Sequence, residues 1–199
     1  MVLCIFSSHA QTFNQDPGHK EFLSVNDVKV SLPNGFDTQR LKLNDKVAYV
    51  PHQKYDLGLL IAVAEKPIDS EYTERLASLA AYHLFPKEKE GYHWKKLAGY
   101  QKVSKYEVGG GMLQGFNGHQ RVLMQYRQLK VSGKDIVVGY SFGLGRGDEA
   151  KVLFDRNLGG DSMPGWYAQA HMVASITGEK YIEINPGTSI AAPPPGRKN

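Results

Sequence analysis

The sequence predicts an α+β protein, in which an antiparallel sheet has helices packed on it. Short apolar runs with strand-like alternation are joined by turn residues, most clearly at Ser132-Gly133-Lys134. Helical periodicity follows Ser70 and again follows Pro164. The 199 residues are 41% hydrophobic and 22% charged, which is typical of one folded domain of ordinary size.

The chain divides into four segments. Residues 2–10 are apolar and then small, and Ser8-His9-Ala10 has the small-x-small form of a signal-peptidase site. We therefore expect a periplasmic or secreted protein; the alternative is an ordinary N-terminal tail. The expected segments are the remnant of an export signal over 1–10, a linker over 11–21, one α+β domain over 22–184 and a disordered, proline-rich tail over 185–199.

Three strands and a helix are expected in the first half of the domain. Alternation over 28–32 predicts a half-buried strand, and residues 47–50 predict a second one. The continuous apolar run 57–64 predicts a strand that is covered on both faces. Asp69 or Ser70 can cap the helix that follows.

The second half begins with a polar, aromatic link over 92–94 and a strand over about 100–108. Three consecutive glycines, Gly109 to Gly111, are expected to break the chain there. A long strand over 121–127 then pairs with residues 136–142 in a hairpin.

Two helices are expected to close the domain. Asp148 can cap a short helix that runs through Phe154. Ser162-Met163-Pro164 opens another, because proline is tolerated in a first helical turn, and Gly178 ends it. The resulting order is three strands, a helix, three strands and closing helices.

This layout has characteristic turn segments at two points, namely Leu32-Pro33-Asn34-Gly35-Phe36 after the first strand and Gly115-Phe116-Asn117-Gly118 before the central hairpin. Over residues 22–178 it resembles the Mog1/PsbP-like α/β/α sandwich and its small exported bacterial members. That fold includes a photosystem subunit, a Ran-binding protein and envelope proteins, most of them without a catalytic constellation. The resemblance implies a monomeric, cofactor-free accessory or interaction module of the bacterial cell envelope, which binds a protein partner or small ligand.

A serine hydrolase is the alternative function. Residues 139–143, Gly-Tyr-Ser-Phe-Gly, have the form of a nucleophile elbow, and Asp161 and His171 follow Ser141 in the order of an α/β-hydrolase. An elbow requires a helix directly after the serine, whereas two further glycines follow within 144–147. The segment between Ser141 and His171 is also too short for the βα units of that fold. We therefore favour a plain strand at Ser141.

Other functional classes have little support. The seven histidines lack the three- or four-residue spacing of a helical metal site, and Cys4 is the only cysteine. The net charge of +4 comes from scattered residues, which does not favour nucleic-acid binding. No apolar run approaches the roughly 20 residues that span a bilayer. We expect no metal, no nucleic-acid partner and no membrane span.

The central hairpin offers the best candidate for binding. Strand alternation places the side chains of His119, Arg121, Gln125 and Arg127 together on one face, with Leu123 between them. If that face is exposed, it suits an acidic ligand or a protein partner. A solvated polar face without a ligand would show the same pattern.

Overall fold

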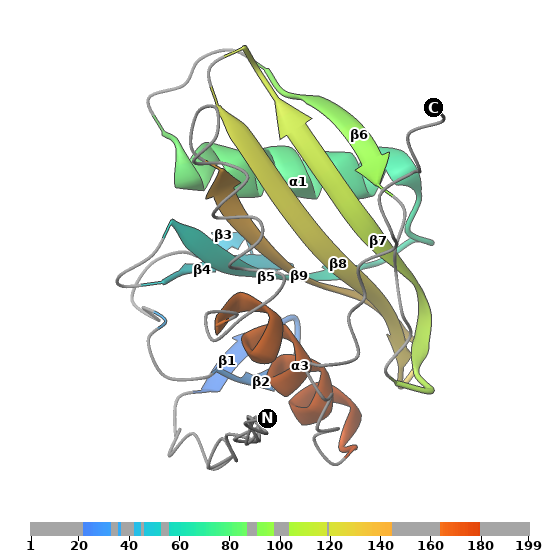
Figure 1. The fold of residues 1–199 in the computed structure, drawn as a ribbon. Helices are drawn as coiled ribbons and strands as arrows, with labels where there is room; N and C mark the ends of the chain where they lie inside the picture. The colour runs from blue at the N-terminus through green and yellow to red at the C-terminus, as the bar shows by residue number, and fades with distance from the viewer. Residues whose placement is uncertain are drawn as a thin grey trace, which may run out of the picture.

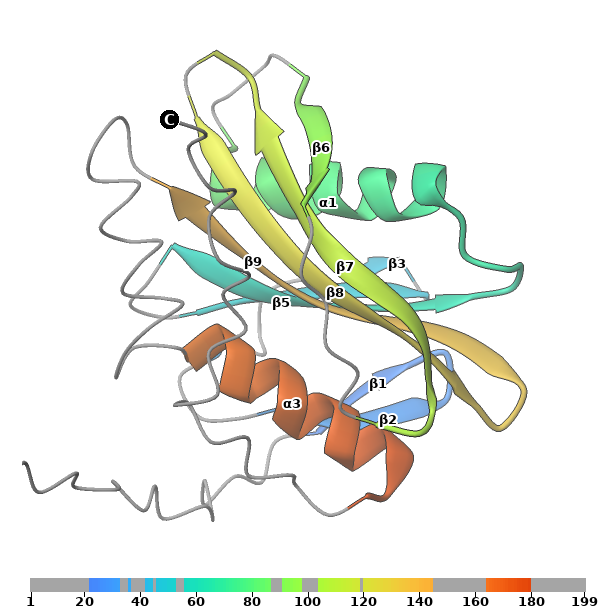
Figure 2. The same cartoon turned by 45° about the vertical axis from the view of Figure 1, so that its right-hand side comes forward.

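The structure is a computed structural model. It describes residues 22–32, 36, 42–44, 46–52, 56–86, 91–97, 104–118, 120–144 and 164–179. Within this part of the chain, a seven-stranded antiparallel sheet has a helix on each face, and a two-stranded hairpin lies beside one of the helices (Figures 1 and 2). The predicted α+β class is confirmed. The predicted export signal, linker, C-terminal tail and helix over 148–154 lie outside the described residues.

The strands of the large sheet follow the order β3-β4-β5-β9-β8-β7-β6. Their bounds are β3 Lys42–Asn44, β4 Val47–Pro51, β5 Leu57–Ala64, β6 His93–Leu97, β7 Glu107–Phe116, β8 Arg121–Val131 and β9 Lys134–Leu144. The sheet thus joins two units of sequential strands, β3–β5 and β6–β9. They meet where β5 pairs with β9, with Leu57 opposite Phe142.

Two tight hairpins depend on residues with positive φ. Ser132 and Gly133 have φ of 51° and 77° and join β8 to β9, as predicted. Asn26 and Asp27 have φ of 43° and 63° and join β1 (Phe22–Val25) to β2 (Val28–Ser31). Asparagine and aspartate tolerate this region better than most residues, so they can form such a turn without glycine. Sequence reasoning missed β1.

The start of one described helix and the end of the other lie at the predicted residues. Asp69 caps α1 (Ser70–Leu84), because its carboxylate accepts a hydrogen bond of 2.7 Å from the backbone N–H of Tyr72. Gly178, with φ of 69°, ends α3 (Pro164–Thr177).

The sheet separates two apolar cores. Leu59 and Ile61 on β5 pack on the side of α3 and the β1–β2 hairpin, whereas Leu60 and Ala62 pack on the side of α1. Figures 1 and 2 show the two helices on opposite faces of the sheet. β5 is therefore covered on both faces, as its continuous apolar run predicted.

The glycine triplet does not break the chain. Gly109 to Gly111 lie inside β7, and His93 and Trp94 of the predicted link belong to β6, at one end of the strand order. Glycine suits β7 because neighbouring side chains cross it: a Cβ at Gly115 would lie 2.6 Å from the ring of Trp94. The Trp94 ring also donates a 2.8 Å hydrogen bond to Ser78 on α1, so it packs over the sheet edge.

Candidate functional site

Ser141 lies in the middle of a regular strand. It pairs with Gly58 of β5 on one side and with Met124 of β8 on the other, and β9 continues to Leu144. Its side chain is fully buried. The predicted strand is therefore confirmed, because a nucleophile elbow requires the serine at an exposed strand-to-helix turn.

Packing on the α1 side explains the glycines around Ser141. A Cβ at Gly139 would lie 2.8 Å from the terminal methyl of Met124, and one at Gly143 would lie 2.5 Å from the ring of Phe85. The next strand shows the same relationship, since the ring of Tyr49 lies over Gly58. The Gly-x-Ser-x-Gly pattern thus leaves room for large neighbours from β8 and from the end of α1.

On the α1 side of the sheet, the buried atoms Ser141 Oγ, Tyr49 Oη and His83 Nε2 make no hydrogen bond of standard geometry among the described residues. The rings of Tyr49 and His83 stack with centroids 5.2 Å apart. Burial raises the pKa of Tyr49, and the nearby Ser141 hydroxyl only partly opposes that increase. Burial lowers the pKa of His83, which favours its neutral form.

His171 lies on the opposite side of the sheet from Ser141. It belongs to α3, and its Nε2 is 3.1 Å from the hydroxyl of Ser31 on β2. Its neighbours Met172 and Val173 pack in the apolar core on that side. The sheet therefore separates the proposed base from the proposed nucleophile, which contradicts the pairing of Ser141 with His171 that the hydrolase alternative requires. Asp161 lies outside the described residues.

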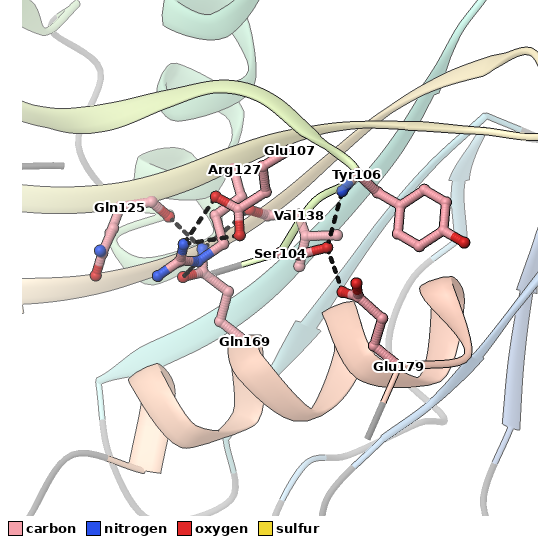
Figure 3. A network of polar contacts seen from close by, with 8 residues as sticks. All are labelled: Ser104, Tyr106, Glu107, Gln125, Arg127, Val138, Gln169 and Glu179. Carbon is pink, nitrogen blue, oxygen red and sulfur yellow. Dashed lines mark hydrogen bonds and ion pairs between the residues drawn. The ribbon is translucent and has the colours of Figure 1, made fainter. Parts of the chain in front are cut away.

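A buried polar network includes two of the predicted binding residues (Figure 3). Nη1 of Arg127 donates hydrogen bonds of 3.1 and 3.0 Å to the two carboxylate oxygens of Glu107. Its Nε donates one of 3.1 Å to the side-chain oxygen of Gln169 on α3. The amide nitrogen of Gln169 donates to the backbone carbonyls of Gln125 and Val138, at 3.0 and 2.9 Å.

These contacts correct the prediction of an exposed binding face. Alternation does place Arg127 and Gln125 on one side of β8, but α3 covers that side, and their exposed fractions are 1% and 5%. Burial also raises the pKa of Tyr140, and the buried Arg127 charge only partly opposes that increase. The network fixes α3 to the sheet, and Ser104 adds a hydrogen bond to Glu179 just after the helix (Figure 3).

Arg121 remains exposed, because it lies at the far end of β8. It is opposite Phe116 of β7, which in turn is opposite His93 of β6. The Arg121 guanidinium lies 5.4 Å from the centroid of the Phe116 ring, and Phe116 is 44% exposed. Lys95, also exposed, points to the same side of β6 as His93 and is opposite Gln114.

We call these five residues, His93, Lys95, Gln114, Phe116 and Arg121, the β6–β8 surface. Sequence reasoning found only Arg121 among them, because the others become neighbours through a strand register that it did not predict. His119 lies outside the described residues.

No group of three or more His, Cys, Asp or Glu side chains in the described part of the chain could hold a metal ion. None of the described helices has the length and apolar character needed to cross a membrane.

Known proteins resemble this chain in structure only. No protein-family model matches its sequence, and no curated protein matches it either. A mutant of protein Mog1 matches with a TM-score of 0.50 and 14% identity, over 80% of this chain and 96% of that one. The Saccharomyces cerevisiae Ran-binding protein Mog1p matches with a TM-score of 0.50 and 13% identity, over 79% of this chain and 93% of that one. The predicted Mog1/PsbP-like fold is thereby confirmed.

Proposed function

We propose that this protein is a non-catalytic interaction module, which binds a protein partner through the β6–β8 surface. The observation that carries this proposal is the exposed pair formed by Phe116 and Arg121. The fold adds support, because a solved structure with the same fold is described as a Ran-binding protein.

Phe116 and Arg121 have the chemistry of an interface centre. Aromatic residues and arginine are enriched at protein interfaces and among the residues that contribute most to binding. Here the Phe116 ring already holds the Arg121 guanidinium in the free protein. Arg121 therefore loses less conformational entropy when a partner binds. A partner that covers Phe116 would also remove its exposed apolar surface from water.

A photo-crosslinking phenylalanine analogue at position 116 of the full chain tests this proposal in the native cell. The matched control is the same analogue at Phe22, an exposed phenylalanine that lies beside Lys29 on the β1–β2 hairpin. We expect a discrete protein adduct from position 116 that excess unmodified protein suppresses, and no such adduct from position 22. Equal labelling from both positions, or none from 116, would contradict the proposal.

We further propose that the protein is exported and acts as a monomeric accessory protein of the bacterial cell envelope. The support is the signal-peptidase pattern at Ser8-His9-Ala10. Cell fractionation, with mass spectrometry of the mature N-terminus, should find a periplasmic or secreted chain that begins at Gln11. A cytoplasmic chain that retains residues 2–10 would contradict export, and light scattering of a stable dimer would contradict the monomer.

A further inference from the structure

We propose that the partner binds the β6–β8 surface through an extended acidic segment that also carries an apolar side chain. This inference rests on the proposed function and adds the chemistry of the partner. It follows from three features of the surface: its unbalanced positive charge, its exposed aromatic ring and the spacing of its side chains.

The charge of the surface is basic and unbalanced. Arg121 and Lys95 supply cations, and His93 adds an imidazole beside them. β6 and β8 contain no Asp or Glu, and the single carboxylate of β7 is Glu107, at the other end of that strand and buried against Arg127. Neither cation therefore has a carboxylate partner among the described residues.

Two other exposed lysines of the described chain, Lys46 and Lys130, do have such partners. Lys46 lies 2.6 Å from a carboxylate oxygen of Glu65, and Lys130 lies 3.3 Å from one of Asp135. At the β6–β8 surface, by contrast, no carboxylate of the described residues forms an ion pair with Lys95 or Arg121. An acidic partner provides the missing carboxylates, and complementary charge both orients and accelerates association.

The Phe116 ring can strengthen an ion pair between Arg121 and a carboxylate of the partner. An ion pair that is fully exposed contributes little, because water and salt screen it. Phe116 lies beneath the guanidinium of Arg121, so an apolar partner side chain on this ring would exclude water from the new ion pair. We therefore expect the partner segment to combine carboxylates with at least one apolar residue.

The strand geometry indicates an extended partner. His93 and Lys95 are alternate residues of β6, which places them about 7 Å apart on the same side of the sheet. An extended segment has the same spacing between its alternate side chains. The surface lies at the start of β6, the end of β7 and the start of β8. In Figure 1 these strand ends are in the upper part of the molecule, whereas α3 is in the lower part, so the helix does not cover them.

Fluorescence anisotropy with a synthetic peptide tests the inference on the full chain. The probe is a labelled peptide in which glutamates alternate with threonines around a central phenylalanine. We expect saturable binding that weakens as salt is added, because salt screens exposed charges. The same peptide with glutamine in place of glutamate should bind at least about tenfold more weakly.

Variants locate the binding site. Phe116→Ala and Arg121→Glu should each weaken peptide binding about tenfold or more, since each removes a central contact. The matched controls Phe22→Ala and Lys29→Glu change a similar pair, in which the Lys29 ammonium lies 4.2 Å from the centroid of Phe22, and should leave binding unchanged. Circular dichroism checks that every variant is folded. Amide NMR shifts on peptide addition should be largest at the β6–β8 surface and small in the β1–β2 hairpin.

Several outcomes would overturn the inference. The first is the absence of peptide binding, and the second is an equal loss in the β1–β2 controls. The third is binding of phosphatidylglycerol vesicles or single-stranded DNA through Phe116 and Arg121 when the peptide does not bind. If the crosslinked adduct at position 116 forms but resists both Arg121→Glu and the acidic peptide, the proposed function stands and the acidic partner is wrong.

Discussion

Arg127 and Glu107 form an ion pair inside the protein, where one guanidinium nitrogen lies 3.1 and 3.0 Å from the two carboxylate oxygens. Their exposed fractions are only 1% and 2%. Water therefore cannot replace either partner without a rearrangement of the core. Because Gln169 on α3 bonds to the same guanidinium, this pair connects the stability of the sheet to the docking of the helix.

Replacing one member of this pair should be strongly destabilising. Arg127→Met leaves the Glu107 carboxylate buried without its main partner, and we expect a loss of about 3–5 kcal/mol in the free energy of unfolding. Urea unfolding followed by circular dichroism measures it. The double variant Arg127→Met with Glu107→Leu removes both charges and should recover much of the loss. A single variant within about 1 kcal/mol of wild type would contradict this account.

Gly58→Ala should also destabilise the protein. An added Cβ would lie 2.2 Å from Cζ and Oη of Tyr49, whose side chain is buried and has little room to move. We expect a loss of about 1–3 kcal/mol from this overpacking. Gly91→Ala is the matched control, because nothing lies within 4 Å of its added Cβ. Thermal unfolding compares the two, and equal midpoints would show that Tyr49 moves aside easily.

Ser141→Ala should leave the stability unchanged or slightly higher. The serine hydroxyl is buried and makes no hydrogen bond of standard geometry among the described residues, so its removal costs at most a contact with the Tyr49 hydroxyl and spares its desolvation. The free energy of unfolding should stay within about 1 kcal/mol of wild type, or rise. Folded wild-type protein should also resist a fluorophosphonate probe. Labelling that Ser141→Ala abolishes would show an activated serine and refute the structural role.

His83 should make the protein less stable in mild acid. Burial lowers its pKa in the folded state, whereas an unfolded histidine titrates near pH 6.5. Below about pH 6.5 the unfolded chain therefore binds more protons than the folded one, and stability falls as the pH falls through the folded-state pKa. Urea unfolding across this range should show a smaller acid loss in His83→Gln than in wild type. Identical losses would assign the pH dependence to other groups.

Much of the fold could be predicted because its signals are local. The apolar run 57–64 identified a strand covered on both faces, and Asp69 marked the start of α1. The Ser132-Gly133 turn fixed the central hairpin, since its two positive φ values depend only on those residues. Each of these features is determined within a few residues of the chain.

The candidate site could not be predicted in the same way, because it depends on contacts between distant segments. Alternation along β8 identified the side on which Arg127 and Arg121 lie, but not how far α3 would cover that side. Arg127 is buried beneath α3 and against Glu107, whereas Arg121 is exposed. Phe116 escaped notice because its contact with Arg121 follows from the β7–β8 register. The glycine triplet was misjudged because the side chains that lie against it, Gln128 at Gly109 and Tyr126 at Gly111, belong to β8 and not to β7 itself.

The pairing of β5 with β9 has a consequence for the order of folding. Each of the units β3–β5 and β6–β9 is built from strands that follow one another, so local contacts suffice to form it. The joint between them requires the closure of a long loop, which is entropically costly and slow. We expect the β5 amides that bond to β9 to gain protection later in pulsed hydrogen exchange than those that bond to β4, and simultaneous protection would refute this. During synthesis, β5 can therefore pair with β9 only after the chain through Leu144 has left the ribosome.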